Sequence, residues 1–135
     1  MRSTSAPALL CALACCLPTA QAAGLVSIEW SADGRFAKEV TVPGHKFAEA
    51  CAKLPAGTTV DWTFEAGAPM DFNIHFHEGK EVRFAARQEG IAGSAGTLQA
   101  PVEQDYCWMW SNKSASDASL KLQLQRRKTQ DAGAG

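Results

Sequence analysis

The chain is 135 residues long and carries 13 basic and 14 acidic residues, which gives a formal net charge of −1. A charge so close to zero indicates no polyanionic partner, and the basic cluster at residues 126–128 lacks the interleaved aromatic residues that would indicate nucleic-acid binding. The length is enough for one hydrophobic core but not for two.

The N-terminal segment is typical of a secretory signal peptide. A basic residue at position 2 precedes an apolar stretch over residues 8–17, and Ala20-Gln21-Ala22 supplies a small-x-small cleavage site. A membrane-spanning helix needs roughly 20 apolar residues, so this stretch is too short for a lasting anchor. A lipoprotein is the alternative, because Cys15 and Cys16 lie in the apolar stretch, but the residues before them fit a lipidation signal poorly. We expect cleavage near Ala22 and a periplasmic or secreted protein.

One domain is expected to follow, at residues 23–125, with a disordered tail at 126–135. Three of the five cysteines lie in the predicted signal peptide, so the exported chain keeps Cys51 and Cys107. In an oxidising compartment, two cysteines in a small domain favour a structural disulfide. A pair of free thiols is the minor alternative.

Period-two alternation of apolar and polar residues predicts strands along the exported chain. Glu78-Gly79-Lys80 separates two alternating runs and predicts the turn of a hairpin over residues 70–86. The segment Gly90–Gly96 contains three glycines and little hydrophobicity, which predicts a flexible loop. Further strands are expected at 26–30, 60–64, near Leu98, at 106–111 and at 120–124.

The segment 47–54 leaves two alternatives open. Phe47, Cys51 and Leu54 recur at helical spacing, but the segment is short and is bounded on both sides by proline and glycine. It is expected to form either one helical turn or an irregular strand.

Together these elements predict an all-β fold, an antiparallel β-sandwich of about seven to eight strands with one disulfide. A closed barrel of strands is the alternative. The core is expected to be rich in aromatic side chains, which bury a large apolar area each. The residues expected to point inward are Trp62, Phe64, Phe72, Phe76, Phe84, Tyr106, Trp108 and Trp110.

The order of four segments along the chain is similar to their order in a known protein family. They are Pro55-Ala56-Gly57 before a strand with Trp and Phe, Asp71-Phe72-Asn73-Ile74, the run from Tyr106 to Asn112, and the alternating run from Leu120 to Leu124. In this order the chain resembles the GOLD domain, a β-sandwich of the p24 cargo-receptor proteins of the eukaryotic secretory pathway and of scattered bacterial proteins.

The resemblance implies a disulfide between Cys51 and the cysteine after the tyrosine, Cys107, in agreement with the expected compartment. The p24 proteins continue into a coiled coil and a membrane span, whereas this sequence continues into a polar tail, so their cargo-receptor function is not carried over. The chain is more similar to small, stand-alone exported proteins of Proteobacteria that contain a Phe-Asn-Ile-His-aromatic-His strand.

The sharpest local feature is the His-x-His pair at positions 75 and 77. Alternation buries the apolar residues of this strand and places Asn73, His75 and His77 together on its opposite face. Same-face neighbours on a strand lie about 6 to 7 Å apart at Cα, so two imidazoles can converge on one ion. Glu78 adds a carboxylate. Imidazole and carboxylate ligands suit Cu(II), Zn(II) or Ni(II), whereas a thioether favours Cu(I).

Two methionines complete the candidate ligand set. If the strand at 106–111 buries its aromatic residues, Met109 lies on the other face and can approach the histidines, while Met70 lies where the histidine strand begins. The predicted metal ligands are therefore His75, His77, Met109 and Met70, with copper as the expected ion. Alternatively, the histidines bond to neighbours or water and Met109 fills a gap between strands. A reduced Cys107 would instead allow a thiolate-ligated copper site.

No Gly-x-Ser-x-Gly, His-Glu-x-x-His or phosphate-loop motif occurs, so we expect no enzymatic activity. The preferred hypothesis is a periplasmic protein that binds copper, or a similar transition metal, for storage, transfer or tolerance. The alternative is a protein-interaction or ligand-binding module of the cell envelope. That alternative predicts an exposed apolar or aromatic patch near the histidine pair.

Overall fold

The computed structural model describes residues 24–127, which form seven β-strands and no helix. The predicted signal peptide and residues 128–135 of the predicted tail lie outside the described residues. In residues 24–127 there is accordingly no helix that could cross a membrane. The strands are β1 (Leu25–Ser27), β2 (Arg35–Val42), β3 (Phe47–Leu54), β4 (Thr59–Glu78), β5 (Glu81–Gln99), β6 (Gln104–Ser111) and β7 (Ala118–Arg126).

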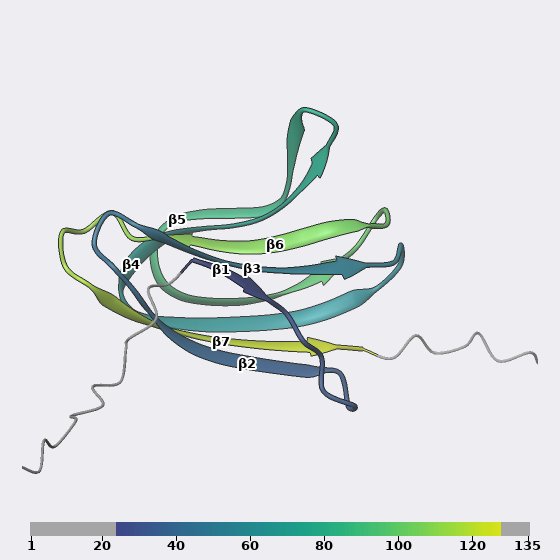
Figure 1. Ribbon diagram of the computed structural model, residues 1–135, viewed down its shortest axis with the longest axis horizontal. Helices are drawn as coiled ribbons and strands as arrows, with labels where there is room; N and C mark the ends of the chain where they lie inside the picture. Colours follow the sequence, from purple (N-terminus) through teal and green to yellow (C-terminus); the bar gives the residue numbers. More distant parts are fainter. Residues whose placement is uncertain (1–23, 128–135) are drawn as a thin grey trace, which may run out of the picture.

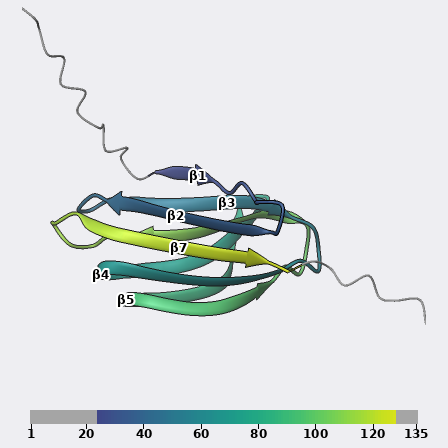
Figure 2. The same ribbon diagram turned by 90° about the horizontal axis from the view of Figure 1, so that it is seen from below.

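The strands form one sheet with the order β1-β3-β6-β4-β7-β2, and β5 pairs with β4 (Figure 1). Strand β4 is 20 residues long and belongs to two layers. Its residues 71–75 pair with β6 and its residues 60–66 pair with β7. We call layer A the strands β1, β3 and β6 with the second half of β4, and layer B the strands β2 and β7 with the first half of β4. Figure 2 shows the layers from the side.

The bend between the two layers lies in the middle of β4 and β5. The pairing of β4 with β5 shifts in register between Glu65 and Met70, and the segment between them contains Gly67 and Pro69. On β5, Gly90 has a φ of 64°, a left-handed conformation that favours glycine, and its N–H donates to Asp71 Oδ1 at 3.0 Å. A bulged strand bends and twists more strongly, which lets both strands pass from one layer to the other.

The predicted all-β fold with one disulfide is confirmed, with two differences in its pairing. The two layers are parts of one continuous sheet rather than two separate sheets, because β4 runs through both. Strand β1 pairs in parallel with β3, whereas every other pairing is antiparallel. The sheet ends at β1 on one side and β2 on the other, so it is open rather than closed.

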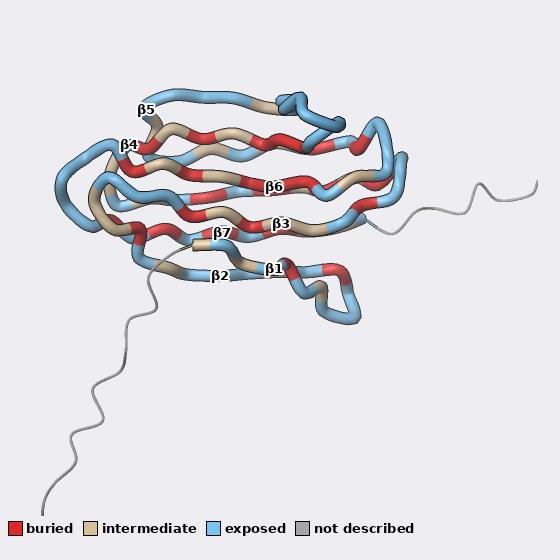
Figure 3. Tube along the Cα trace, turned by 45° about the horizontal axis from the view of Figure 1, so that its top comes forward, coloured by how far each residue is buried: buried red, intermediate tan, exposed pale blue. Residues whose placement is uncertain are grey.

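Buried and less buried residues alternate along strands such as β6 (Figure 3). The buried side chains point between the two layers and form the core there. Phe64, Phe72 and Trp110 pack there with ring centroids 4.8 to 5.5 Å apart. All of the aromatic residues predicted to point inward are buried except Phe84, which is 48 % exposed. That prediction was wrong because the end of the β4–β5 hairpin projects beyond the body of the sandwich (Figure 1).

Three segments differ from the sequence predictions or resolve them. Residues 47–54 form a strand, β3, rather than a helical turn. The segment Gly90–Gly96 belongs to strand β5 rather than to a loop. Gly96 allows close packing there, since a Cβ at this position would lie 2.6 Å from the ring of Trp62. Strand β2 was not predicted, although Phe36, Val40 and Val42 alternate along it.

The C-terminal boundary of the domain also lies beyond the predicted one. Strand β7 includes Arg126, and the backbone N–H of Arg127 donates to the carbonyl of Thr59 at 2.9 Å. The guanidinium of Arg127 binds both carboxylate oxygens of Asp61, with bonds of 2.8 and 2.7 Å. The first two residues of the predicted tail are therefore part of the sheet.

The disulfide joins Cys51 of β3 to Cys107 of β6, two residues that face each other directly in the ladder. Their Cα atoms are 4.1 Å apart, and the two cysteines are separated by 56 positions in the sequence. The link therefore fastens a pairing that the sheet already makes, and it restricts the unfolded chain more than the folded one.

We expect that a Cys51→Ala/Cys107→Ala variant keeps the fold but loses about 2 to 4 kcal/mol of its free energy of unfolding. The reason is that the unfolded chain regains the conformational freedom of a long loop. Urea denaturation followed by tryptophan fluorescence measures the difference. An unchanged denaturation midpoint would contradict this account.

Candidate functional site on the outer face of layer A

Strand register brings the predicted site residues to one surface. Residues 71 to 77 of β4 alternate between the core and the solvent side, and the neighbouring strands have the same alternation. His75 lies opposite Cys107, and Asn73 lies opposite Met109. Met109 in turn lies opposite Glu49 on β3. We call this surface the outer face of layer A; it consists of Phe47, Glu49, Cys51, Asp71, Asn73, His75, His77, Cys107, Met109 and Ser111.

His75 is the centre of a hydrogen-bonded network on this face. Its Nδ1 lies 2.7 Å from Oδ1 of Asn73 on the same strand. Its Nε2 lies 3.2 Å from Oε1 of Glu49, which comes from β3 on the far side of β6. The side chain of His75 is 9 % exposed and that of Glu49 is 19 % exposed. Residues of two strands, β4 and β3, thus place oxygen atoms beside both ring nitrogens of one imidazole.

Three influences act on the pKa of His75, two of them downward and one upward. Burial disfavours the imidazolium and lowers the pKa of His75 below its ordinary value near 6.5, and this is the largest influence. The Glu49 carboxylate raises the pKa, and the neighbouring His77 lowers it. The net result is an imidazole that is neutral at pH 7 and that resists protonation in the folded state.

The predicted histidine pair is adjacent, with ring centroids 5.4 Å apart and ring planes 84° apart. Met109 lies on the same face, as expected, because its register partner is Asn73. An ion bound by His75 must displace either Asn73 or Glu49, since these two residues contact its ring nitrogens.

The structure does not bring the fourth predicted ligand, Met70, to this face. Its side chain belongs to the hydrophobic core and is only 1 % exposed. Alternation along β4 explains the position, because residue 70 has the inward phase of Phe72 and Ile74. His75 and His77 are odd-numbered residues of β4 and lie on its outer face. Residue 70 is even-numbered, so closeness to these histidines along the strand does not bring its side chain to their face.

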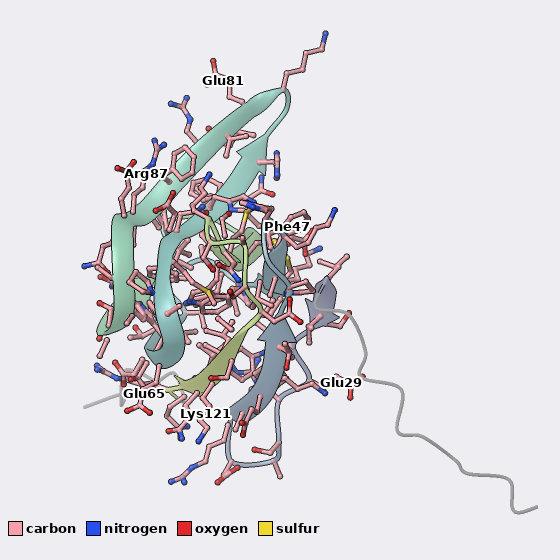
Figure 4. The ribbon with its side chains drawn as sticks, turned by 90° about the vertical axis from the view of Figure 1, so that its left-hand side faces the viewer. Glu29, Phe47, Glu65, Glu81, Arg87 and Lys121 are labelled. Atoms are coloured by element: carbon pink, nitrogen blue, oxygen red, sulfur yellow. A yellow bond between two sulfur atoms is a disulfide. The ribbon has the colours of Figure 1, made fainter. Side chains whose placement is uncertain are left out.

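Sequence reasoning missed the apolar residues of the projecting hairpin. Val82 faces His77 and Phe84 faces His75 in the β4–β5 ladder, so both extend the outer face of layer A. Val82 is 45 % exposed and Phe84 is 48 % exposed. The guanidinium carbon of Arg87 lies 4.8 Å from the centre of the Phe84 ring. Figure 4 shows Glu81 near the tip of the hairpin and Arg87 lower on β5.

The hairpin also has an open edge and a groove beside it. Along its 19 residues β5 pairs with β4 alone, and most of its residues are exposed (Figure 3). A groove of about 690 Å³ lies between the two halves of β5. Phe76 and Leu98 contribute buried apolar atoms to it, and Arg83 contributes a cation. The register of the hairpin places Val82 and Phe84 on the face of the histidines, and the projection of the hairpin beyond the sandwich (Figure 1) leaves them exposed.

No known family model matches the chain, and none of the curated proteins matches it. Solved structures do show the same fold. The structure is similar to PliG of Aeromonas hydrophila, a periplasmic inhibitor of g-type lysozyme, with a TM-score of 0.59, 16 % identity and coverage of 78 % of this chain and 98 % of that one.

Two further solved structures extend the comparison. PliG of Salmonella Typhimurium, also a periplasmic inhibitor of g-type lysozyme, matches with a TM-score of 0.53, 13 % identity and coverage of 77 % and 98 %. The pre-peptidase C-terminal domain of a Bacillus anthracis collagenase matches with a TM-score of 0.55, 12 % identity and coverage of 76 % and 94 %. Identities this low establish a shared small all-β fold and nothing about activity.

The lowered pKa of His75 has a consequence for stability. The unfolded chain takes up a proton near pH 6.5, whereas the folded chain does so only at lower pH. We therefore expect the free energy of unfolding to fall as the pH drops from about 7 to 5, and a His75→Gln variant to lose this part of the pH dependence. Urea denaturation across this range measures it.

The control is His45→Asn, at an exposed turn position with a φ of 59° that asparagine tolerates. This control should keep the pH dependence of the original chain. If the free energy of unfolding changed with pH in the same way in the His75→Gln variant and in the original chain, the lowered pKa of His75 would be contradicted.

Proposed function

We propose that the chain is an exported protein-binding module of the cell envelope, and that its projecting β4–β5 hairpin and the outer face of layer A are the binding surface. This function is binding rather than catalysis. The periplasm is the proposed location, on the basis of the signal-like N-terminal sequence.

The exposed aromatic residue of the hairpin carries the proposal. Phe84 is about half exposed on the projecting two-stranded arm, with Val82 two residues away on the same face and Arg87 against its ring. Exposed aromatic and arginine side chains are enriched at the energetic centres of protein interfaces. Phe76 and Trp110 point into the core, so the patch near the histidines consists of the hairpin residues.

The fold comparisons support the same class of function. Two of the solved structures are periplasmic proteins that bind and inhibit a g-type lysozyme, which shows that this sandwich can present a protein-binding surface in that compartment. A g-type lysozyme is therefore the first partner to test. The resemblance to GOLD domains stays a prediction about the fold family and adds no partner.

We expect the exported chain to bind and inhibit a g-type lysozyme, and a Val82→Ser/Phe84→Ser variant to bind about thirtyfold more weakly or worse, since removing a central anchor costs at least about 2 kcal/mol. Calorimetric titration measures binding, and the rate at which peptidoglycan suspensions clear measures inhibition. The matched control is Gln123→Ser, which changes an exposed residue of layer B.

Two results would contradict the proposal in different ways. Equal binding by the double variant and the control would remove the hairpin as the binding surface. If the chain does not bind the lysozyme, photo-crosslinking from position 84 and from position 123 in periplasmic extract is the decisive comparison. Equal labelling of proteins from both positions would remove the hairpin as a specific binding surface for any partner.

Copper binding is the second candidate function, and the closeness of the His75 and His77 rings is the observation that favours it. Met109 lies on the same face and would supply a thioether. The engagement of His75 with Asn73 and Glu49 weighs against it, because binding must break one of these contacts. We therefore rank this function second.

If copper is the ligand, the oxidised chain will bind one Cu(I) or Cu(II) tightly, and a His75→Ala/His77→Ala variant will lose that binding. A Met109→Leu variant should then weaken Cu(I) binding more than Cu(II) binding, because a thioether prefers the softer ion. Competition with a chromophoric chelator measures both affinities. Equal weak binding by the original chain and the double histidine variant would eliminate the site.

A further inference from the structure

The disulfide lies among groups that would all be metal ligands if it were open. The carboxylate of Glu49 and the two sulfur atoms of Cys51 and Cys107 lie within 4.8 Å of one another. Glu49 is also 3.2 Å from Nε2 of His75, which faces Cys107 from the neighbouring strand. Two sulfurs and one carboxylate therefore lie together on the outer face of layer A, and one imidazole contacts the carboxylate.

The sheet keeps these groups together whether or not the sulfurs are bonded. Cys51 and Cys107 face each other in a ladder of eight residue pairs between β3 and β6. Glu49 is two residues before Cys51, so it has the same facing. Breaking the sulfur–sulfur bond removes none of the backbone hydrogen bonds of this ladder, and the two cysteine side chains remain neighbours.

The geometry points to a metal site in the reduced protein: Cys51, Cys107, Glu49 and His75 bind one thiophilic divalent cation of the zinc type. An external dithiol gives two electrons and two protons to the disulfide, the S–S bond breaks, two thiols form and the dithiol becomes a cyclic disulfide. The cation then displaces the two thiol protons and forms two metal–thiolate bonds.

The donor set fits zinc in kind and in spacing. Zinc prefers four ligands in a tetrahedron, drawn from thiolate, imidazole and carboxylate. Bond lengths near 2.0 to 2.3 Å require ligand atoms roughly 3.3 to 3.8 Å apart, so the two sulfurs have to separate once their bond is broken, and the carboxylate and the imidazole have to move toward them.

This site lies on the proposed protein-binding surface but does not rest on the protein-binding function, and it differs from the copper site predicted from the sequence. It uses both cysteines and Glu49, and it requires neither His77 nor a methionine. The state of the disulfide decides which of the two metal sites exists, since disulfide sulfurs do not act as thiolates.

The test is a zinc titration of the exported chain in two redox states. One sample is reduced with a dithiol, which is then removed without air, and the other stays oxidised. We expect the reduced chain to bind one Zn²⁺ in competition with a chromophoric chelator and to melt at a higher temperature with zinc than without it. The oxidised chain should show neither effect.

Variants of the reduced chain identify the ligands. Cys51→Ser/Cys107→Ser should abolish zinc binding, and Glu49→Gln and His75→Gln should each weaken it about tenfold or more. His77→Ala is the matched control, because it removes a neighbouring imidazole of the same face that is not one of the proposed ligands, and it should weaken zinc binding much less than His75→Gln does. Co²⁺ in place of Zn²⁺ should give thiolate charge-transfer absorption and tetrahedral ligand-field bands.

Several results would overturn the assignment. They are a reduced chain that binds no zinc, a reduced chain whose near-ultraviolet circular dichroism is lost and is not restored by zinc, and binding that depends on the cysteines but not on Glu49 or His75. Equal losses of affinity from His75→Gln and His77→Ala would also overturn it, because they would assign the ion to the histidine pair.

Discussion

The fold depends on the continuity of β4 and β5 through the bend. These two strands are the only ones that belong to both layers, so the layers are held together by backbone as well as by side-chain packing. The bend requires a register shift in β4 and the left-handed Gly90 in β5. Without it the hairpin would be a flat ribbon with no enclosed core.

The same hairpin arranges the outer face of layer A. Because β4 pairs with β6 on one side and β5 on the other, His75 has Cys107 and Phe84 as its two cross-strand neighbours. A rigid apolar arm, a buried imidazole and a disulfide therefore share one surface. A partner protein on the hairpin would also cover His75, which couples the protonation of this residue to binding.

Alternation predicted much of this arrangement from the sequence. It identified the faces of β4 and β6, and hence the adjacency of His75, His77 and Met109, because the period of a strand determines which side chains share a face. Alternation failed where the surroundings of a residue depend on how distant segments pack against each other. Nothing in the local pattern shows that the end of the hairpin projects beyond the sandwich (Figure 1), or that Gly96 lies in strand β5 against the ring of Trp62.

The role of Glu49 could not be predicted because it depends on pairing between distant segments. Its contact with His75 requires β3, β6 and β4 to lie side by side. This order of strands in the sheet differs from their order along the chain. The disulfide alone gave a clue, since a link from Cys51 to Cys107 places β3 beside β6. Residues two positions from a cross-strand disulfide then share its face.

The open edge of β5 has a further consequence for the behaviour of the protein at high concentration. Natural sheets protect their edges with charged residues, prolines or short strands. The first half of β5 has such charges, including Arg83 and Arg87, but residues 91–98 contain no charged residue and no proline. This uncharged half offers unpaired backbone groups to any extended chain, so it is the segment of the molecule least protected against aggregation through added strands.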